Sequence, residues 1–331
     1  MDHDGRHCRL MSKLILCTWA FGIVCLLFGN MVMAEGKSHE KNFVKYRKSP
    51  TVRVIPKLEY AKYKTQNLFL DLYLPLPLGR DRPGVVVIRG GGWKVGDRKR
   101  FAHVASALAE RGVAAACIEY RTANKATFPA AIQDVKAAVR WMRANAAKYG
   151  IDPQAIGTMG GSSGAYMALL AGLTTGVPEF EGDGGNAGIS SEIQAVVAMA
   201  VPADLLALSA DNKLIVGDFL HTTPEQGNQT WRWASPVNHI RPDGPPVLLL
   251  HGADDDSVPP KQSTDFADLY RQAGASAEIH ILDGAPHAFW NYHPWFDNAM
   301  EFAGDFFLTL KRGGKAPVGS SSSAGLTGQL N

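Results

Sequence analysis

The chain has 331 residues, of which 46% are hydrophobic and 20% are charged, enough for one large α/β domain with its own core. Its net charge of +3 is close to neutral, and the sequence contains neither a basic stripe nor an acidic block. This balance excludes an electrostatic binder of nucleic acid and a chain dominated by a charged, solvating tail.

The N-terminus has the pattern of a secretory signal peptide over residues 1–34. Lys13 precedes an apolar run over 14–28, and small residues before and at Ala34 predict cleavage after that position. A polar linker follows over 35–50. We therefore expect a secreted or periplasmic protein without stable membrane association after cleavage. The alternative is an uncleaved membrane anchor built on the same apolar segment.

The cysteine content indicates that the hydrophobic core, rather than disulfide bonds, stabilises the fold. Cys8, Cys17 and Cys25 lie in the predicted leader, which leaves Cys117 as the one cysteine of the mature chain. A single cysteine cannot form an internal disulfide. Cys117 lies in an apolar strand pattern, and apolar surroundings raise a thiol pKa, so a nucleophilic role is not expected for it.

Strand and helix patterns alternate through a predicted catalytic domain over residues 51–312. This alternation predicts an α/β fold with a mostly parallel central sheet of about eight strands and helices on both faces. The expected strands cover 67–75, 84–90, 112–120, 155–160, 193–201, 246–252 and 277–284, and the expected helices cover 100–112, 128–150, 165–173, 261–274 and 295–312. The Gly- and Ser-rich segment 313–331 is predicted to be a disordered tail.

Two long irregular regions interrupt the alternation, at 174–192 and 202–245. Such regions often build the binding site of an α/β domain. The first contains Glu179, Glu181 and Asp183, which are candidate ligands for a calcium ion, although their spacing matches no EF-hand loop. Neither region is long enough to suggest a large separate cap domain.

One short motif indicates a reactive serine. Residues 160–164 read G-x-S-x-G between a predicted strand and a predicted helix, with Ser162 at the centre. A sharp strand-to-helix turn exposes the serine hydroxyl, and the first amides of the helix favour developing negative charge. The backbone N–H of Ser163 is then one oxyanion donor, whereas its side chain is expected to point elsewhere.

A serine hydroxyl is a weak nucleophile that needs a base, and the base needs an orienting carboxylate. Downstream of the motif, one strand ends in Asp254, Asp255 and Asp256, and the next strand is followed by His287. Both segments come after separate strands, as an order of serine, acid and histidine requires. The residues alone leave the choice among the three aspartates open.

Three consecutive glycines, at 90–92, come directly after the buried apolar strand in "VVVIRGGGW". Glycine lets backbone N–H groups approach a substrate oxygen, so Gly91 and Gly92 are predicted oxyanion donors together with Ser163. The alternative is a plain glycine-rich turn. Trp93 follows the glycines and Trp290 follows His287, and each is a candidate for the substrate pocket or for core packing.

The segments "RGGGW", "HGADDDSVP", "GAPHAF" and the block Phe128–Gly172 resemble α/β-hydrolases of the hormone-sensitive-lipase and acetyl-esterase type. Within that group the chain is most similar to bacterial acetyl-xylan and feruloyl esterase-like (BD-FAE-type) enzymes. The resemblance places Asp255 in the acid position of the family pattern H-G-x-x-D-x-x-V-P. It also shows a departure, because Arg89 stands where the family usually has His. We expect Arg89 to shape the loop, with pairing to an acid or to a substrate carboxylate as alternatives.

These observations predict an exported serine carboxylic-ester hydrolase with Ser162 as nucleophile, His287 as base and Asp255 as its orienting acid. The resemblance implies short acyl esters, especially acetyl groups on polysaccharide, and no metal or organic cofactor. Two alternatives remain. One is a peptidase related to prolyl oligopeptidases, and the other is a catalytically inactive hydrolase fold that binds ligands.

Overall fold

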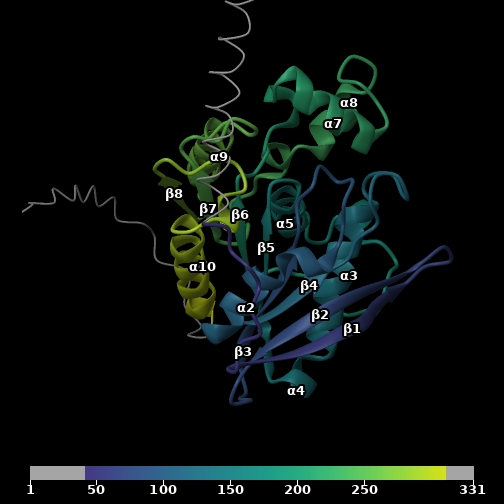
Figure 1. Cartoon of the computed structure of the whole chain (residues 1–331). Coiled ribbons are helices and arrows are strands. Elements are labelled where there is room, and N and C mark those ends of the chain that lie inside the picture. The colour runs from purple at the N-terminus through teal and green to yellow at the C-terminus, as the bar shows by residue number, and fades with distance from the viewer. Residues whose placement is uncertain (1–41, 311–331) are drawn as a thin grey trace, which may run out of the picture.

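The computed structural model describes residues 42–310, and Figure 1 shows a twisted central sheet between layers of helices. The predicted signal peptide and tail lie outside the described residues. The strands of the sheet are β1 (Val52–Lys62), β2 (Asn67–Pro75), β3 (Arg82–Ile88), β4 (Ala114–Ile118), β5 (Ile151–Gly161), β6 (Ala195–Met199), β7 (Val247–Gly252) and β8 (Ala277–Leu282).

The eight described strands form one sheet in the order β1-β2-β4-β3-β5-β6-β7-β8. Strand β2 pairs antiparallel with both β1 and β4, and the pairs from β4 to β8 are parallel. The predicted α/β architecture with a mostly parallel sheet is confirmed. Strand β1 was not predicted, because its partly exposed residues and two register shifts against β2 obscure the period of two.

The described helices are α2 (Ala102–Glu110), α3 (Ala130–Ala144), α4 (Ala146–Tyr149), α5 (Ser163–Leu173), α6 (Pro178–Glu181), α7 (Ala210–Leu220), α8 (Asn228–Ala234), α9 (Lys261–Gln272) and α10 (Trp295–Leu310). Short 3₁₀ turns lie at η1 (Arg98–Phe101), η2 (Leu205–Ala207), η3 (Pro236–His239) and η4 (Phe289–Asn291). No helix within residues 42–310 is both long enough and apolar enough to cross a bilayer.

Two hydrophobic clusters lie on the two faces of the sheet. Along β3, Val86 and Ile88 belong to one cluster with residues of α3, α5 and α9, whereas Val85 and Val87 belong to the other with residues of α2 and α10. Successive side chains of a strand point to opposite faces, so a strand covered on both sides is apolar throughout. This double burial explains the continuous apolar runs of the central strands.

The structure corrects two predicted segments. The single helix expected over 128–150 is divided at Asn145, which separates α3 from α4. The region 202–245 is not irregular, because it contains α7 and α8, which Figure 1 shows beyond the end of the sheet. Trp231 of α8 is fully buried, and its indole N–H donates to the carbonyl of Thr222 at 3.1 Å. This region is therefore a packed helical element over the site rather than a loop.

Candidate active site

Ser162 occupies the sharp turn between β5 and α5. Its backbone has φ of 56° and ψ of −125°, a conformation that non-glycine residues rarely adopt. The flanking glycines permit this turn, because a Cβ on Gly160 would lie 2.3 Å from the backbone of Gly164. A Cβ on Gly164 would lie 2.2 Å from the carbonyl oxygen of Ile88. The G-x-S-x-G spacing therefore reflects backbone contacts that leave no space for side chains.

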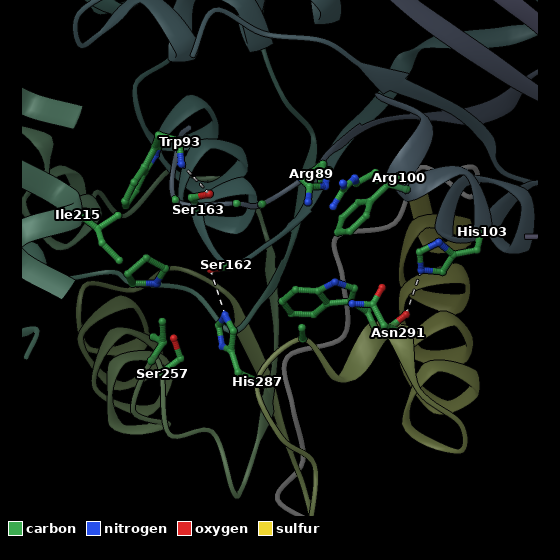
Figure 2. A pocket seen from close by; sticks show the side chains of 18 of the residues that line it. Arg89, Trp93, Arg100, His103, Ser162, Ser163, Ile215, Ser257, His287 and Asn291 are labelled. Atoms are coloured by element: carbon green, nitrogen blue, oxygen red, sulfur yellow. Dashed lines mark hydrogen bonds between the residues drawn. The ribbon is translucent and has the colours of Figure 1, made fainter. Parts of the chain in front are cut away.

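The structure brings Ser162, His287 and Asp255 together in one hydrogen-bonded row. The Nε2 atom of His287 lies 3.2 Å from Ser162 Oγ, and its Nδ1 atom lies 2.8 Å from Asp255 Oδ2. Figure 2 shows the imidazole pointing at the Ser162 hydroxyl. Because the loops after β5, β7 and β8 meet at the carboxyl edge of the parallel sheet, residues far apart in sequence converge there.

The neighbouring aspartates differ sharply in their surroundings. Asp255 is 6% exposed, whereas Asp254 and Asp256 are exposed to solvent. Asp255 Oδ1 accepts from the backbone N–H groups of Ser257 at 3.0 Å and Val258 at 2.8 Å. Only Asp255 therefore reaches the imidazole of the row.

A second histidine, which the sequence did not single out for this role, supports the same carboxylate. The Nε2 atom of His251 lies 3.2 Å from Asp255 Oδ2 and 2.8 Å from the carbonyl of Val258. Burial by itself raises the pKa of Asp255. The hydrogen bonds from His251 and His287, together with the charge of His287, outweigh burial and hold that pKa well below its ordinary value. Asp255 is therefore an anion at any ordinary pH.

The glycine loop after β3 faces Ser162. A Cβ on Gly90 would lie 3.1 Å from the Ser162 Cβ, and Gly91 and Gly92 have φ of 129° and 58°. The backbone N–H groups of Gly91, Gly92 and Ser163 donate to no other group within the described part of the chain. Free amides beside a serine hydroxyl are suited to hold an oxyanion.

Two side chains fix this loop against α5 and β4. Ser163 Oγ accepts from the backbone N–H of Trp93 at 3.3 Å, so its side chain has a structural contact that the sequence did not suggest. The hydroxyl of Tyr120 lies 2.7 Å from the carbonyl oxygen of Val95 and 3.0 Å from that of Arg89. Tyr120 thus bridges the two ends of the loop, and no sequence spacing identified it.

Ser162 opens into a pocket of about 820 Å³. Trp93 and Trp290 both line it and are 3% and 4% exposed. Trp93 stacks on Phe219 with ring centroids 4.7 Å apart, and Trp290 packs edge-to-face against His287 at 5.8 Å. Each tryptophan therefore does both things that were expected as alternatives: it lines the pocket and it packs in the core.

The two sides of the pocket differ in character (Figure 2). Trp93, Ile215 and Ser257 lie on one side, and the apolar residues Pro202, Leu208, Val216 and Val258 line the same pocket. The other side contains Arg89, Arg100 and the N-terminal segment 43–46. That segment is held by a bridge between Phe43 and Tyr292 and by a hydrogen bond from Val44 N–H to the Asn291 carbonyl at 2.8 Å.

The acidic region 174–192 does not contribute to the pocket lining. Glu181 instead forms ion pairs with Lys136 at 2.7 Å and Arg140 at 3.4 Å, on α3. Its carboxylate also accepts from the Ser191 hydroxyl at 2.6 Å. Among residues 42–310, no three His, Cys, Asp or Glu side chains converge as metal ligands. The region fastens to α3, and the expectation that it helps to build the binding site is wrong.

Known proteins resemble this chain in sequence and in structure. Residues 70–270 match the sequence profile of the BD-FAE family. The probable carboxylic ester hydrolase LipM of Mycobacterium tuberculosis is 34% identical over 70% of this chain and 55% of its own length. The esterase LipQ of the same organism is 31% identical over 70% of this chain. The chain thus spans about half the length of the curated relatives it matches.

Solved structures cover more of the fold. A truncated form of a carbohydrate esterase from gut microbiota has a TM-score of 0.73 at 30% identity, covering 81% of this chain and 100% of that one. A thermophilic esterase from the Planctomycetes species Thermogutta terrifontis, solved with propionate bound, has a TM-score of 0.66 at 29% identity. It covers 83% of this chain and 100% of its own.

Proposed function

The chain belongs to the BD-FAE family of the α/β-hydrolase fold, as its sequence motifs predicted, and we propose that it is a serine carboxylic-ester hydrolase. The observation that carries this proposal is the row in which Asp255 accepts from His287 and His287 faces the Ser162 hydroxyl. Esterase relatives in sequence and in structure support the same activity.

In the first half of the reaction, Ser162 Oγ attacks the carbonyl carbon of the ester. The hydroxyl proton passes to His287 Nε2, and the carbonyl electron pair moves onto oxygen. The N–H groups of Gly91, Gly92 and Ser163 hold that oxyanion, and one such donor is worth about 3 kcal/mol. The charge of Asp255 stabilises the imidazolium and keeps its Nδ1–H in place.

In the second half, the oxyanion re-forms the carbonyl and the bond to the alcohol oxygen breaks. His287 gives its proton to that oxygen, so the alcohol leaves and an acyl-serine remains. A water molecule then attacks the acyl carbon while His287 accepts its proton. Collapse of the second oxyanion returns the proton to Ser162 and releases the carboxylic acid.

We propose short acyl esters, in particular acetyl esters of polysaccharide, as the substrates. Buried apolar side chains, including Trp93, Leu208 and Val216, line the pocket and suit the alkyl part of a short acyl group. One structural neighbour is named a carbohydrate esterase, and another binds propionate. Export by the leader 1–34 is part of the same proposal, because an enzyme that acts on extracellular polysaccharide has to leave the cytoplasm.

Hydrolysis of p-nitrophenyl acetate, butyrate and octanoate tests the proposal on the chain from Glu35, which keeps every described residue. We expect the fastest turnover on acetate, and no burst or turnover with Ser162→Ala. Ser163→Ala is the matched control. It should keep activity within about fivefold of wild type, because its side chain makes structural contacts, a hydrogen bond from Trp93 N–H and one with the Tyr120 hydroxyl, and does not face the reacting carbonyl. Full activity of Ser162→Ala, or no ester cleaved by wild type, contradicts the assignment.

A further inference from the structure

The lining of the pocket has an unbalanced charge. It contains four cationic side chains, Lys45, Arg89, Lys99 and Arg100, and no Asp or Glu. Figure 2 shows Arg89 and Arg100 on the side of Ser162 that lies away from Trp93. A water-accessible wall with one sign of charge attracts a ligand of the opposite sign.

The cationic side chains of this region form two groups, those that line the pocket and those that do not. Lys94 and Arg98 do not line the pocket, and each pairs with a carboxylate, Lys94 with Asp218 at 2.6 Å and Arg98 with Asp71 at 2.8 Å. The four lining cations form no ion pair with any carboxylate among residues 42–310. The fold thus neutralises the neighbouring cations, whereas those of the pocket have no ion pair, and the charge of Asp97 acts on Arg89 only beyond ion-pair distance.

Arg89 is the central member of this group. Its guanidinium has one protein hydrogen bond, a 3.4 Å contact from NH1 to the Val95 carbonyl, although a guanidinium carries five N–H donors. A Cβ added to Gly91 would lie 2.9 Å from the same nitrogen, so the charge lies against the glycine loop. Burial, and then the charge of Arg100, lower the pKa of Arg89. Two like charges held together are unfavourable until an anion lies between them.

The opposite wall decides which part of an ester meets these arginines. The apolar side is formed by buried Trp93, Leu208 and Val216 and accepts a short acyl group. The basic side includes exposed Lys99 and Arg100 and is therefore open to solvent. With the acyl group against these apolar side chains, the alcohol part of the substrate extends along the basic side.

We propose that Arg89 and Arg100 bind a carboxylate carried by the alcohol part of the substrate, such as the uronic-acid units of an acetylated acidic polysaccharide. This inference rests on the ester hydrolysis proposed above and deepens it. The planar forks of two guanidiniums match the two oxygens of a carboxylate, which gives such pairs both strength and direction.

The test compares 4-acetoxybenzoate with 4-acetoxybenzamide, two acetyl esters that differ in the charge of the alcohol part. Arg89→Gln and Arg100→Gln are measured against wild type and against Arg53→Gln, which removes an exposed arginine of β1 outside the pocket. We expect each pocket variant to lower kcat/KM for the carboxylate by roughly ten- to hundredfold more than for the amide. Arg53→Gln should leave both values within about twofold.

Comparing each variant with wild type on both esters cancels their intrinsic reactivity. Inhibition by the product 4-hydroxybenzoate, measured in the same variants, gives a second readout that does not depend on turnover. Equal losses on both esters in Arg89→Gln refute the carboxylate site and indicate a general effect on the glycine loop. The carboxylate site is also refuted if wild type and all variants cleave the two esters with the same ratio of kcat/KM. The proposed ester hydrolysis is then still supported. If wild type cleaves neither ester, the proposed function itself fails.

The polymer arm of the experiment measures acetate release from acetylated homogalacturonan and from acetylated neutral xylan. Wild type should release acetate faster from the uronic-acid polymer, and added salt should reduce that advantage because exposed Lys99 and Arg100 are screened. If wild type releases acetate faster from neutral xylan, and Arg100→Gln does the same, the proposal is contradicted.

Discussion

Replacing Asp255 by asparagine changes one atom of the carboxyl group and, according to the structure, should remove the base. Oδ1 accepts from the N–H groups of Ser257 and Val258, so the carbonyl oxygen of an asparagine must take that place. Its NH2 group then replaces Oδ2 and faces the nitrogens of His251 and His287. The opposite orientation would set the NH2 group against two backbone N–H donors. The amide therefore has only one acceptable orientation.

With an N–H donor at that place, His287 must accept at Nδ1, and its proton moves to Nε2. The imidazole then offers N–H, rather than a lone pair, to Ser162 Oγ, and it cannot take the serine proton. A tautomer reversal of this kind costs about 10⁴ in kcat in the chymotrypsin triad, which is equivalent to about 5.5 kcal/mol in the barrier. We expect a loss of that order in Asp255→Asn, with KM changed by less than about threefold.

Steady-state kinetics on p-nitrophenyl acetate from pH 6 to 9 measures this loss. Asp254→Asn and Asp256→Asn are matched controls, because these exposed neighbours undergo the same substitution without contacting His287. Both controls should remain close to wild type. If Asp255→Asn keeps more than about a tenth of wild-type kcat, the tautomer argument is refuted.

The same substitution should also change how the free energy of unfolding depends on pH. Because the folded pKa of Asp255 lies below the unfolded value of about 3.9, its anion stabilises the fold at any pH above that value. This contribution declines once the pH falls below the unfolded value and is gone only below the folded pKa. The difference in unfolding free energy between wild type and Asp255→Asn, measured by urea denaturation, should therefore shrink below about pH 4. A difference that does not change between pH 7 and 3 contradicts the depressed pKa.

Two further predictions concern positions outside the catalytic row. Tyr120→Phe removes the hydroxyl that contacts the Val95 carbonyl at one end of the glycine loop, so kcat should fall by about tenfold while KM changes little. An unchanged kcat contradicts the bridging role. Glu181→Gln leaves the buried ammonium of Lys136 without its carboxylate, and the unfolding free energy should fall by about 3 kcal/mol in urea titrations. The exposed Glu179→Gln is its control, and equal losses in both variants would refute the ion-pair argument.

The sequence predicted the parts of the molecule whose physics is local. Strands covered on both faces contain continuous apolar runs, such as residues 85–88 of β3 and all of β4, and this pattern is distinctive. Helix α7 was missed because Leu214 and Ile215, exposed on its surface, stand beside buried Val216 and hide the helical period. What packs against an element cannot be read from its own pattern.

The same division holds for the site. The order of strands was enough to bring Ser162 and His287 to one edge, and a family pattern selected Asp255 from three neighbours. The support given by His251 and Tyr120 was not predictable. The contact of His251 with Asp255 depends on how the loop after β7 turns, and Tyr120 and Arg89 follow different strands. A buried histidine at the end of an apolar strand was the only available signal for His251, and it does not specify a partner.

The N-terminal segment 43–46 has a consequence for the order in which the site is assembled. Phe43, which lines the pocket, pairs with Tyr292, so 249 positions separate this part of the pocket wall from the residue that holds it. Contacts of such long range form late, because closing the loop costs entropy before any contact is gained. A ribosome releases Phe43 long before it has made Tyr292. The pocket wall must therefore wait for the end of synthesis, and a nascent chain can bury most of its core before it has a complete place for a substrate.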